Sequence, residues 1–209
     1  MNKNISIGVV VAVVVIAGYF FFRSNEIITP PKNSTIVAFG DSLVQGVGAR
    51  EGHDLVSLLS MEIKAPIVNE GRSGDTTVTA LERIDTVLVH DPGIVIVLLG
   101  GNDYLRKIPK ETTFQNLHTI ISKFKENNTR VLLLGIRGGL LRDTYEKDFE
   151  DFAKREQVPF IPNVLDGLIG KDEYMSDQIH PNDRGYAKIA ERVAPELKRM
   201  LGNLVIPQK

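Results

Sequence analysis

The sequence predicts a three-layer α/β domain with a five-stranded parallel sheet, preceded by an N-terminal transmembrane helix. Two observations predict the domain. From residue 35 onward, short apolar runs alternate with longer segments whose apolar residues recur every three or four positions. Polar turns that contain glycine follow several of these runs. A third observation, an uncharged apolar run over residues 5–22, predicts the membrane helix.

Five short apolar runs predict the strands of the sheet, at residues 35–39, 66–68, 94–99, 131–134 and 159–161. The run 94–99 contains only Ile, Val and Leu, which is typical of a strand that is buried on both faces. We therefore expect this strand at the centre of the sheet.

Segments of helical period lie between and after these strands, at residues 55–63, 78–89, 114–124, 144–156 and 186–197. A helix between consecutive strands provides the crossover that a parallel pair needs. The alternation predicts one domain over residues 35–205.

The apolar run at residues 5–22 would span roughly 27 Å as a helix, which is close to the thickness of a bilayer core. It is flanked by Lys3 and Arg23, and bulky aromatic residues stand at its end, where a small-x-small cleavage pattern would be expected. We expect residues 1–23 to be an uncleaved single-pass anchor with the folded domain on the extracytoplasmic side. A cleaved signal peptide, giving a secreted or periplasmic protein, is the alternative. Residues 24–34, with two prolines, are expected to form a linker.

Composition excludes several classes of function. The chain carries 25 basic and 26 acidic side chains, so it lacks the strong positive charge that is typical of nucleic-acid binding. It contains no cysteine, which excludes a thiolate nucleophile, a disulfide framework and a zinc-thiolate site. No cofactor or metal is expected, and the oligomeric state is left open.

Polar residues cluster where the predicted strands end, at residues 40–42, 69–75 and 100–103. Each cluster alone could be a helix cap or a plain turn. However, the carboxyl ends of parallel strands meet at one edge of the sheet, which is where ligands bind in open α/β folds. We therefore expect these clusters to form one site that supplies a hydroxyl, backbone N–H groups and a side-chain amide.

A candidate base for this site lies before the last helix. Asp177 and His180 stand three residues apart, and Pro181 disfavours a helical conformation at His180. This stretch is therefore expected to be a turn from which the carboxylate and the imidazole both reach the site.

These motifs together resemble the SGNH/GDSL hydrolase superfamily, and within it the bacterial arylesterase, lysophospholipase and acyl-thioesterase group. The resemblance lies in four blocks, residues 38–43, 69–76, 99–103 and 177–181, which occur in the family's order. It implies a flavodoxin-like SGNH hydrolase fold and a serine ester hydrolase that acts on a small-molecule or lipid ester.

The resemblance also implies a role for each site residue. Ser42 is the expected nucleophile, which would form an acyl-enzyme, and His180 and Asp177 complete its catalytic triad. The expected oxyanion hole consists of the Ser42 and Gly74 backbone N–H groups and the Asn102 side chain. Asp41, Asp75 and Asp103 have the simpler roles of capping helices and supporting loops.

Two other functions fit part of the pattern. A carbohydrate O-acetylesterase acting on envelope glycans would use the same catalytic residues. A non-catalytic flavodoxin-like binding domain would use glycine-bearing loops to hold a phosphate, but Gly46 and Gly48 lack the third glycine of such a motif.

Overall fold

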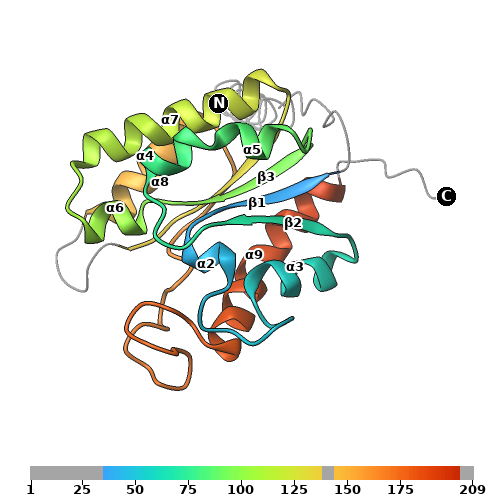
Figure 1. Cartoon of the computed structure of the whole chain (residues 1–209), viewed down its shortest axis with the longest axis vertical. Helices are drawn as coiled ribbons and strands as arrows, with labels where there is room; N and C mark the ends of the chain where they lie inside the picture. The colour runs from blue at the N-terminus through green and yellow to red at the C-terminus, as the bar shows by residue number, and fades with distance from the viewer. Residues whose placement is uncertain (1–34, 138–143, 203–209) are drawn as a thin grey trace, which may run out of the picture.

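The computed structural model describes residues 35–137 and 144–202, which form a parallel sheet covered by helices on both faces (Figure 1). The order of the strands in the sheet is β2-β1-β3-β4-β5, and every pair is parallel. The strands are β1 (Ile36–Gly40), β2 (Ile67–Gly71), β3 (Ile94–Leu98), β4 (Arg130–Leu134) and β5 (Phe160–Ile161). The predicted five-stranded parallel sheet is confirmed, with the 94–98 strand at its centre.

The helices divide between the two faces of the sheet (Figure 1). One face is covered by α2 (Ser42–Gln45), α3 (Leu55–Ile63) and α9 (Asp183–Gly202). The other face is covered by α4 (Thr77–Glu82), α5 (Ile84–Leu88), α7 (Lys110–Glu126) and α8 (Tyr145–Glu156), and α6 (Gly101–Leu105) follows the end of β3.

The alternation of side chains along the strands creates two apolar cores. In β1, Ile36 and Ala38 pack into the core that contains α3 and α9, whereas Val37 and Phe39 pack into the core that contains α7 and α8. The Phe39 ring meets that of Phe124 in α7 edge to face, with 6.0 Å between the centroids. Because both faces of β1 and β3 are buried, these strands contain almost only apolar residues.

The helix expected at residues 78–89 is divided in two. Arg83 leaves the helical conformation with φ −116° and ψ 16°, so that α4 ends and α5 begins at this residue. Periodicity alone did not show the break, because the apolar residues on the two sides of Arg83 still fall on one face.

The second strand is longer than expected. It continues to Gly71, because its backbone pairs with β1 up to the Gly40–Gly71 pair. In the same way, α2 and α6 occupy segments that were expected to be turns. Both are too short to show a periodic pattern.

The expected membrane anchor and linker, residues 1–34, lie outside the described residues, as does the end of the predicted domain beyond residue 202. Within residues 35–137 and 144–202, no helix has the length and apolar character that crossing a membrane requires.

Candidate active site

Ser42 lies at the turn between β1 and α2, where the chain changes direction at the edge of the sheet. The Asp41 side chain caps α2 by accepting a hydrogen bond from the Leu43 N–H at 3.0 Å. The turn is tight: a Cβ on Gly40 would lie 2.3 Å from the Leu98 carbonyl oxygen in β3. Only glycine allows β1 to end this close to its neighbour, and Ser42 follows as the first residue of the helix.

His180 and Asp177 reach Ser42 from the loop before α9. The Nε2 atom of His180 is 3.0 Å from the Ser42 Oγ, and its Nδ1 atom is 2.7 Å from the Asp177 Oδ2. The other carboxylate oxygen of Asp177 accepts the N–H groups of Ile179 and His180, each at 2.8 Å. One carboxylate therefore fixes both the loop and the imidazole.

The charge of Asp177 determines the tautomer of His180. The hydrogen bond from His180, followed by that from the Ile179 N–H, lowers the pKa of Asp177 to about 2. An ionised carboxylate only accepts hydrogen bonds, so Nδ1 of a neutral His180 carries the proton. Nε2 is then left as an acceptor for the Ser42 hydroxyl.

Gly74 lies in the loop between β2 and α4 with φ 81°, a conformation that other residues rarely adopt. Its carbonyl oxygen accepts a hydrogen bond from Arg106 at 2.9 Å, which fixes the orientation of the following peptide. In the part of the chain that the structure describes, neither the Gly74 N–H nor the Ser42 N–H donates to an acceptor. Both amides are thus available to a ligand.

Asn102 reaches the same place from α6. Its Nδ2 atom donates to the Asp75 carbonyl oxygen at 2.9 Å and lies 3.4 Å from the Asp41 Oδ2. The first of these contacts is a good hydrogen bond and the second is long and weak. One N–H of the amide is therefore held firmly, while the other remains able to bind an incoming oxygen.

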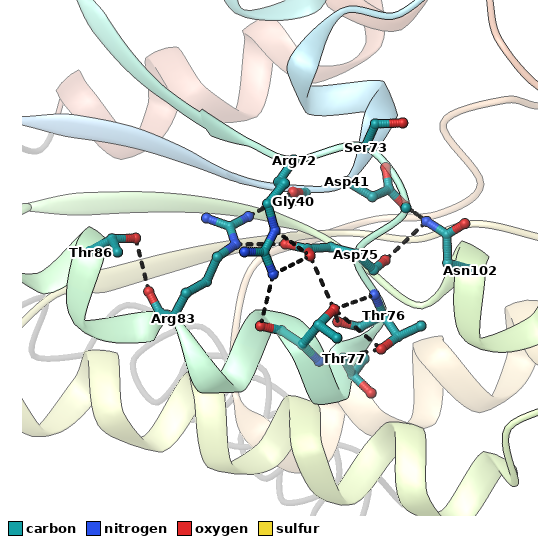
Figure 2. A network of polar contacts seen from close by, with 12 residues as sticks. Gly40, Asp41, Arg72, Ser73, Asp75, Thr76, Thr77, Arg83, Thr86 and Asn102 are labelled. Atoms are coloured by element: carbon teal, nitrogen blue, oxygen red, sulfur yellow. Dashed lines mark hydrogen bonds and ion pairs between the residues drawn. The ribbon is translucent and has the colours of Figure 1, made fainter.

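Three buried carboxylates lie behind these groups, and Figure 2 shows two of them, Asp41 and Asp75. Asp75 is paired with Arg83 at 2.6 Å and with Arg72 at 2.7 Å. Asp103 accepts hydrogen bonds from the Thr77 N–H and hydroxyl. All three carboxylates thus support loops or caps, and none of the three joins the Ser42–His180 contact.

Asp41 is satisfied less completely than the other two: it lacks the arginine partners of Asp75, and its only short hydrogen bond among the described residues comes from the Leu43 N–H. Burial raises its pKa to about 7, against the opposing effect of the Leu43 N–H. The carboxyl group next to Ser42 therefore titrates near neutral pH.

A cavity of about 340 Å³ opens beside Ser42 and Asn102. It is formed by residues from the turn after β1, from α6, from the segments that follow β4 and β5 and from the loop that carries His180. Its apolar lining includes Leu43, Leu105, Ile136, Tyr145, Leu165 and Ile179. Tyr104 and Ile169 are partly exposed at the same cavity. The cavity can hold an apolar group next to the Ser42 hydroxyl.

Of the five residues that the sequence singled out, the structure joins Ser42, His180 and Asp177 in one chain of hydrogen bonds. It places Asn102 on the carbonyl of Asp75, the residue that directly follows Gly74. It also adds groups that the sequence analysis did not identify. Arg83 and Arg106 hold the loop that contains Gly74 and Asp75. No local pattern marks Arg83, because its hydrogen-bond partners lie 8, 13 and 43 residues away.

The parallel sheet and the Ser42–His180–Asp177 chain at its carboxyl edge are the arrangement of a serine hydrolase with an α/β fold. Comparison with known proteins supports this class and gives the family. Residues 38–188 match the model of the GDSL-like Lipase/Acylhydrolase family, and the chain belongs to this family. The predictions of an SGNH fold and of an ester hydrolase are confirmed at this level.

The curated relatives are bacterial enzymes. The chain is 30% identical over 179 residues to the esterase TesA of Pseudomonas aeruginosa, covering 80% of this chain and 89% of that protein. It is 32% identical to the thioesterase 1/protease 1/lysophospholipase L1 of Escherichia coli K12, covering 81% of this chain and 86% of that protein.

Solved structures show the same similarity. The crystal structure of TesA superimposes with a TM-score of 0.74 at 30% identity, covering 80% of this chain and all of that chain. The psychrotrophic esterase EstA from Pseudoalteromonas sp., inhibited by monoethylphosphonate, superimposes with a TM-score of 0.73 at 25% identity, covering 82% of this chain and all of that chain.

The raised pKa of Asp41 predicts a pH dependence of stability. The unfolded carboxyl has a pKa near 3.8 and the folded one a pKa of about 7, so the folded protein binds more protons between these values. The contribution of Asp41 to the free energy of unfolding is therefore fully present below pH 3.8. It is lost as the pH rises through about 7. Asp41→Asn keeps the acceptor for Leu43 but cannot ionise.

Urea denaturation at pH 5 and pH 8 measures this effect. Between pH 5 and pH 8, we expect the free energy of unfolding of the natural protein to decrease by on the order of 1–3 kcal/mol more than that of Asp41→Asn. Parallel losses in the two proteins would contradict the raised pKa.

Proposed function

We propose that the protein hydrolyses carboxylic esters of apolar acyl groups through an acyl-enzyme on Ser42. The observation that carries the proposal is the hydrogen-bonded chain from Ser42 through His180 to Asp177, which ends beside an apolar cavity. The relatives named as esterase and as thioesterase 1/protease 1/lysophospholipase L1 support the same reaction class.

In the first half of this reaction, His180 accepts the Ser42 proton at Nε2 while Oγ attacks the carbonyl carbon. The carbonyl π electrons move to oxygen, and the resulting oxyanion is bound by the Ser42 and Gly74 N–H groups and the Asn102 amide. Collapse of this intermediate breaks the bond to the alcohol, or to a thiol in a thioester, and His180 returns the proton to it.

In the second half, water replaces the alcohol. His180 takes a proton from the water as it attacks the acyl-enzyme, and the same three donors bind the second oxyanion. The acid then leaves and Ser42 regains its proton. Asp177 stays ionised throughout, and it orients and stabilises the imidazolium.

The size and lining of the cavity favour an acyl chain over an acetyl group. An acetyl group has one methyl to bury, whereas the cavity of about 340 Å³ continues along Leu105, Leu165 and Ile179. A carbohydrate O-acetylesterase would leave most of this apolar surface in contact with water. We therefore place esters with medium-length acyl chains ahead of acetylated glycans.

The proposed oxyanion hole predicts the effect of Asn102→Ala. Removal of one preorganised donor is expected to lower kcat by about 10²- to 10³-fold with little change in KM. Hydrolysis of p-nitrophenyl esters by the purified variants measures both constants.

Ser42→Ala should abolish both turnover and labelling by a fluorophosphonate probe. Ser73→Ala is the matched control, because Ser73 is an exposed serine in the neighbouring loop. Labelling that persists in Ser42→Ala would assign the nucleophile to another residue. Absence of labelling and turnover in the natural protein would favour a non-catalytic binding domain.

The apolar cavity predicts the acyl-length profile. In a series from acetate to octanoate, kcat/KM should rise roughly fourfold for each methylene that becomes buried. Leu105→Asp places a charge in the lining and should lower kcat/KM for octanoate roughly tenfold, with a smaller effect on acetate.

Met61→Asp is the matched control for this charge, because Met61 is exposed to a similar degree as Leu105 but does not line the cavity. Preference for acetate in the natural protein would support the O-acetylesterase instead.

We also propose that residues 5–22 hold the protein in a membrane, with the catalytic domain on the extracytoplasmic side. The support is in the sequence: the run of 18 residues is uncharged and is followed by a proline-containing linker. After extraction with alkaline carbonate, esterase activity should remain in the membrane pellet. Deletion of residues 1–23 should move it to the supernatant. A shortened, soluble natural protein would support the cleaved signal peptide.

A further inference from the structure

Arg83 lies at the break between α4 and α5, and its guanidinium group contacts three segments of the chain (Figure 2). It donates to the Gly40 carbonyl at the end of β1 at 3.1 Å and to the Glu70 carbonyl in β2 at 2.9 Å. Its Nε atom donates to the Asp75 carboxylate at 2.6 Å. The group also lies over the Phe39 ring, 4.7 Å from the centroid.

Two of these contacts lie close in sequence to a proposed oxyanion donor. Gly40 is two residues before Ser42, and Asp75 directly follows Gly74. The Asp75 carbonyl oxygen in turn accepts the Asn102 amide at 2.9 Å. The guanidinium therefore connects the segments that carry the three donors, although it touches none of the donors itself.

The chemistry of arginine suits this position. A guanidinium group is planar and presents its N–H donors in a fixed fork, so it can bind two backbone carbonyls and a carboxylate at defined angles. A lysine would keep the charge but could not bind all three groups in this geometry. The side chain is largely buried, with 11% of its surface exposed, so water cannot replace these hydrogen bonds easily.

We propose that Arg83 is a positioning residue, which acts through Asp75 and Gly40 to set the spacing of the Ser42, Gly74 and Asn102 donors. This inference rests on the proposed function of the same site. An oxyanion binds these donors only in the transition state, so an error in their spacing affects turnover more than substrate binding. A misplacement of about 1 Å can cost on the order of 10²-fold in rate.

Arg72 provides a matched comparison. It pairs with the other oxygen of the same carboxylate, Asp75 Oδ1, at 2.7 Å. Its side chain is 54% exposed, and it contacts neither Gly40 nor Glu70 through its guanidinium. Loss of Arg72 thus removes a positive charge beside Asp75 without releasing the strand ends.

The experiment compares Arg83→Lys, Arg83→Met and Arg72→Met in the full chain. The substrate is the p-nitrophenyl ester with the highest turnover in the natural protein. Two inhibitors with the same alkyl chain separate the effects: a trifluoromethyl ketone, which forms a tetrahedral adduct with serine, and the corresponding methyl ketone, which occupies the cavity without a stable adduct. Thermal melting shows which variants are folded.

For Arg83→Lys and Arg83→Met we expect kcat to fall roughly 10- to 100-fold with KM within about twofold. Inhibition by the trifluoromethyl ketone should weaken by a similar factor, and inhibition by the methyl ketone should stay constant. Arg72→Met should keep kcat within about threefold. If Arg83→Met does not fold, Arg83→Lys alone tests the positioning role, because this variant retains the positive charge beside Asp75.

Full turnover in folded Arg83→Lys would overturn the inference. So would an equal weakening of both ketones, which would show a general loosening of the cavity, or an equal fall of kcat in Arg72→Met, which would assign the effect to the charge on Asp75. A natural protein that neither hydrolyses esters nor reacts with the fluorophosphonate would instead contradict the proposed function.

Discussion

The register of the parallel sheet is the constraint on which the site depends. Gly40, the last residue of β1, pairs with Gly71 in β2 and with Leu98 in β3, so three strands end at the same level. The loops that follow them therefore leave the sheet side by side. These loops carry the Ser42 hydroxyl, the Gly74 amide and the Asn102 side chain, which lie up to 60 residues apart in the sequence.

The buried carboxyl groups at this edge of the sheet have unequal partners. Asp75 is paired with two arginines and Asp103 with hydroxyl and amide groups, whereas Asp41 has one strong hydrogen bond and a raised pKa. The carboxylate of the proposed triad, Asp177, has the opposite property: it is exposed and its pKa is lowered by the groups that donate to it. For Asp41 and Asp177, the surroundings of the carboxyl group, rather than its nearness to Ser42, therefore determine the direction in which the pKa is shifted.

The proposed catalytic groups and most of the cavity lining lie on different segments of the chain. The proposed catalytic groups come from the short turns after β1, β2 and β3 and from the loop before α9, where hydrogen bonds fix the backbone. The cavity is formed largely by longer segments after β4 and β5 and by the exposed end of α6. Because loops tolerate substitution better than packed strand ends do, the residues that line the cavity can vary more freely than the groups at the strand ends.

The sequence by itself determined the five strands, most of the helices and the residues that could form the site. These features depend on local periodicity and on short motifs, such as Asp177 and His180 three residues apart, and such signals are contained within a few residues. Only the tertiary structure decided the distances between Ser42 and His180, the end of β2, the break at Arg83 and the shape of the cavity. These depend on contacts between distant segments: the partners of Arg83 are as many as 43 residues away, and a helix period gives no information about them.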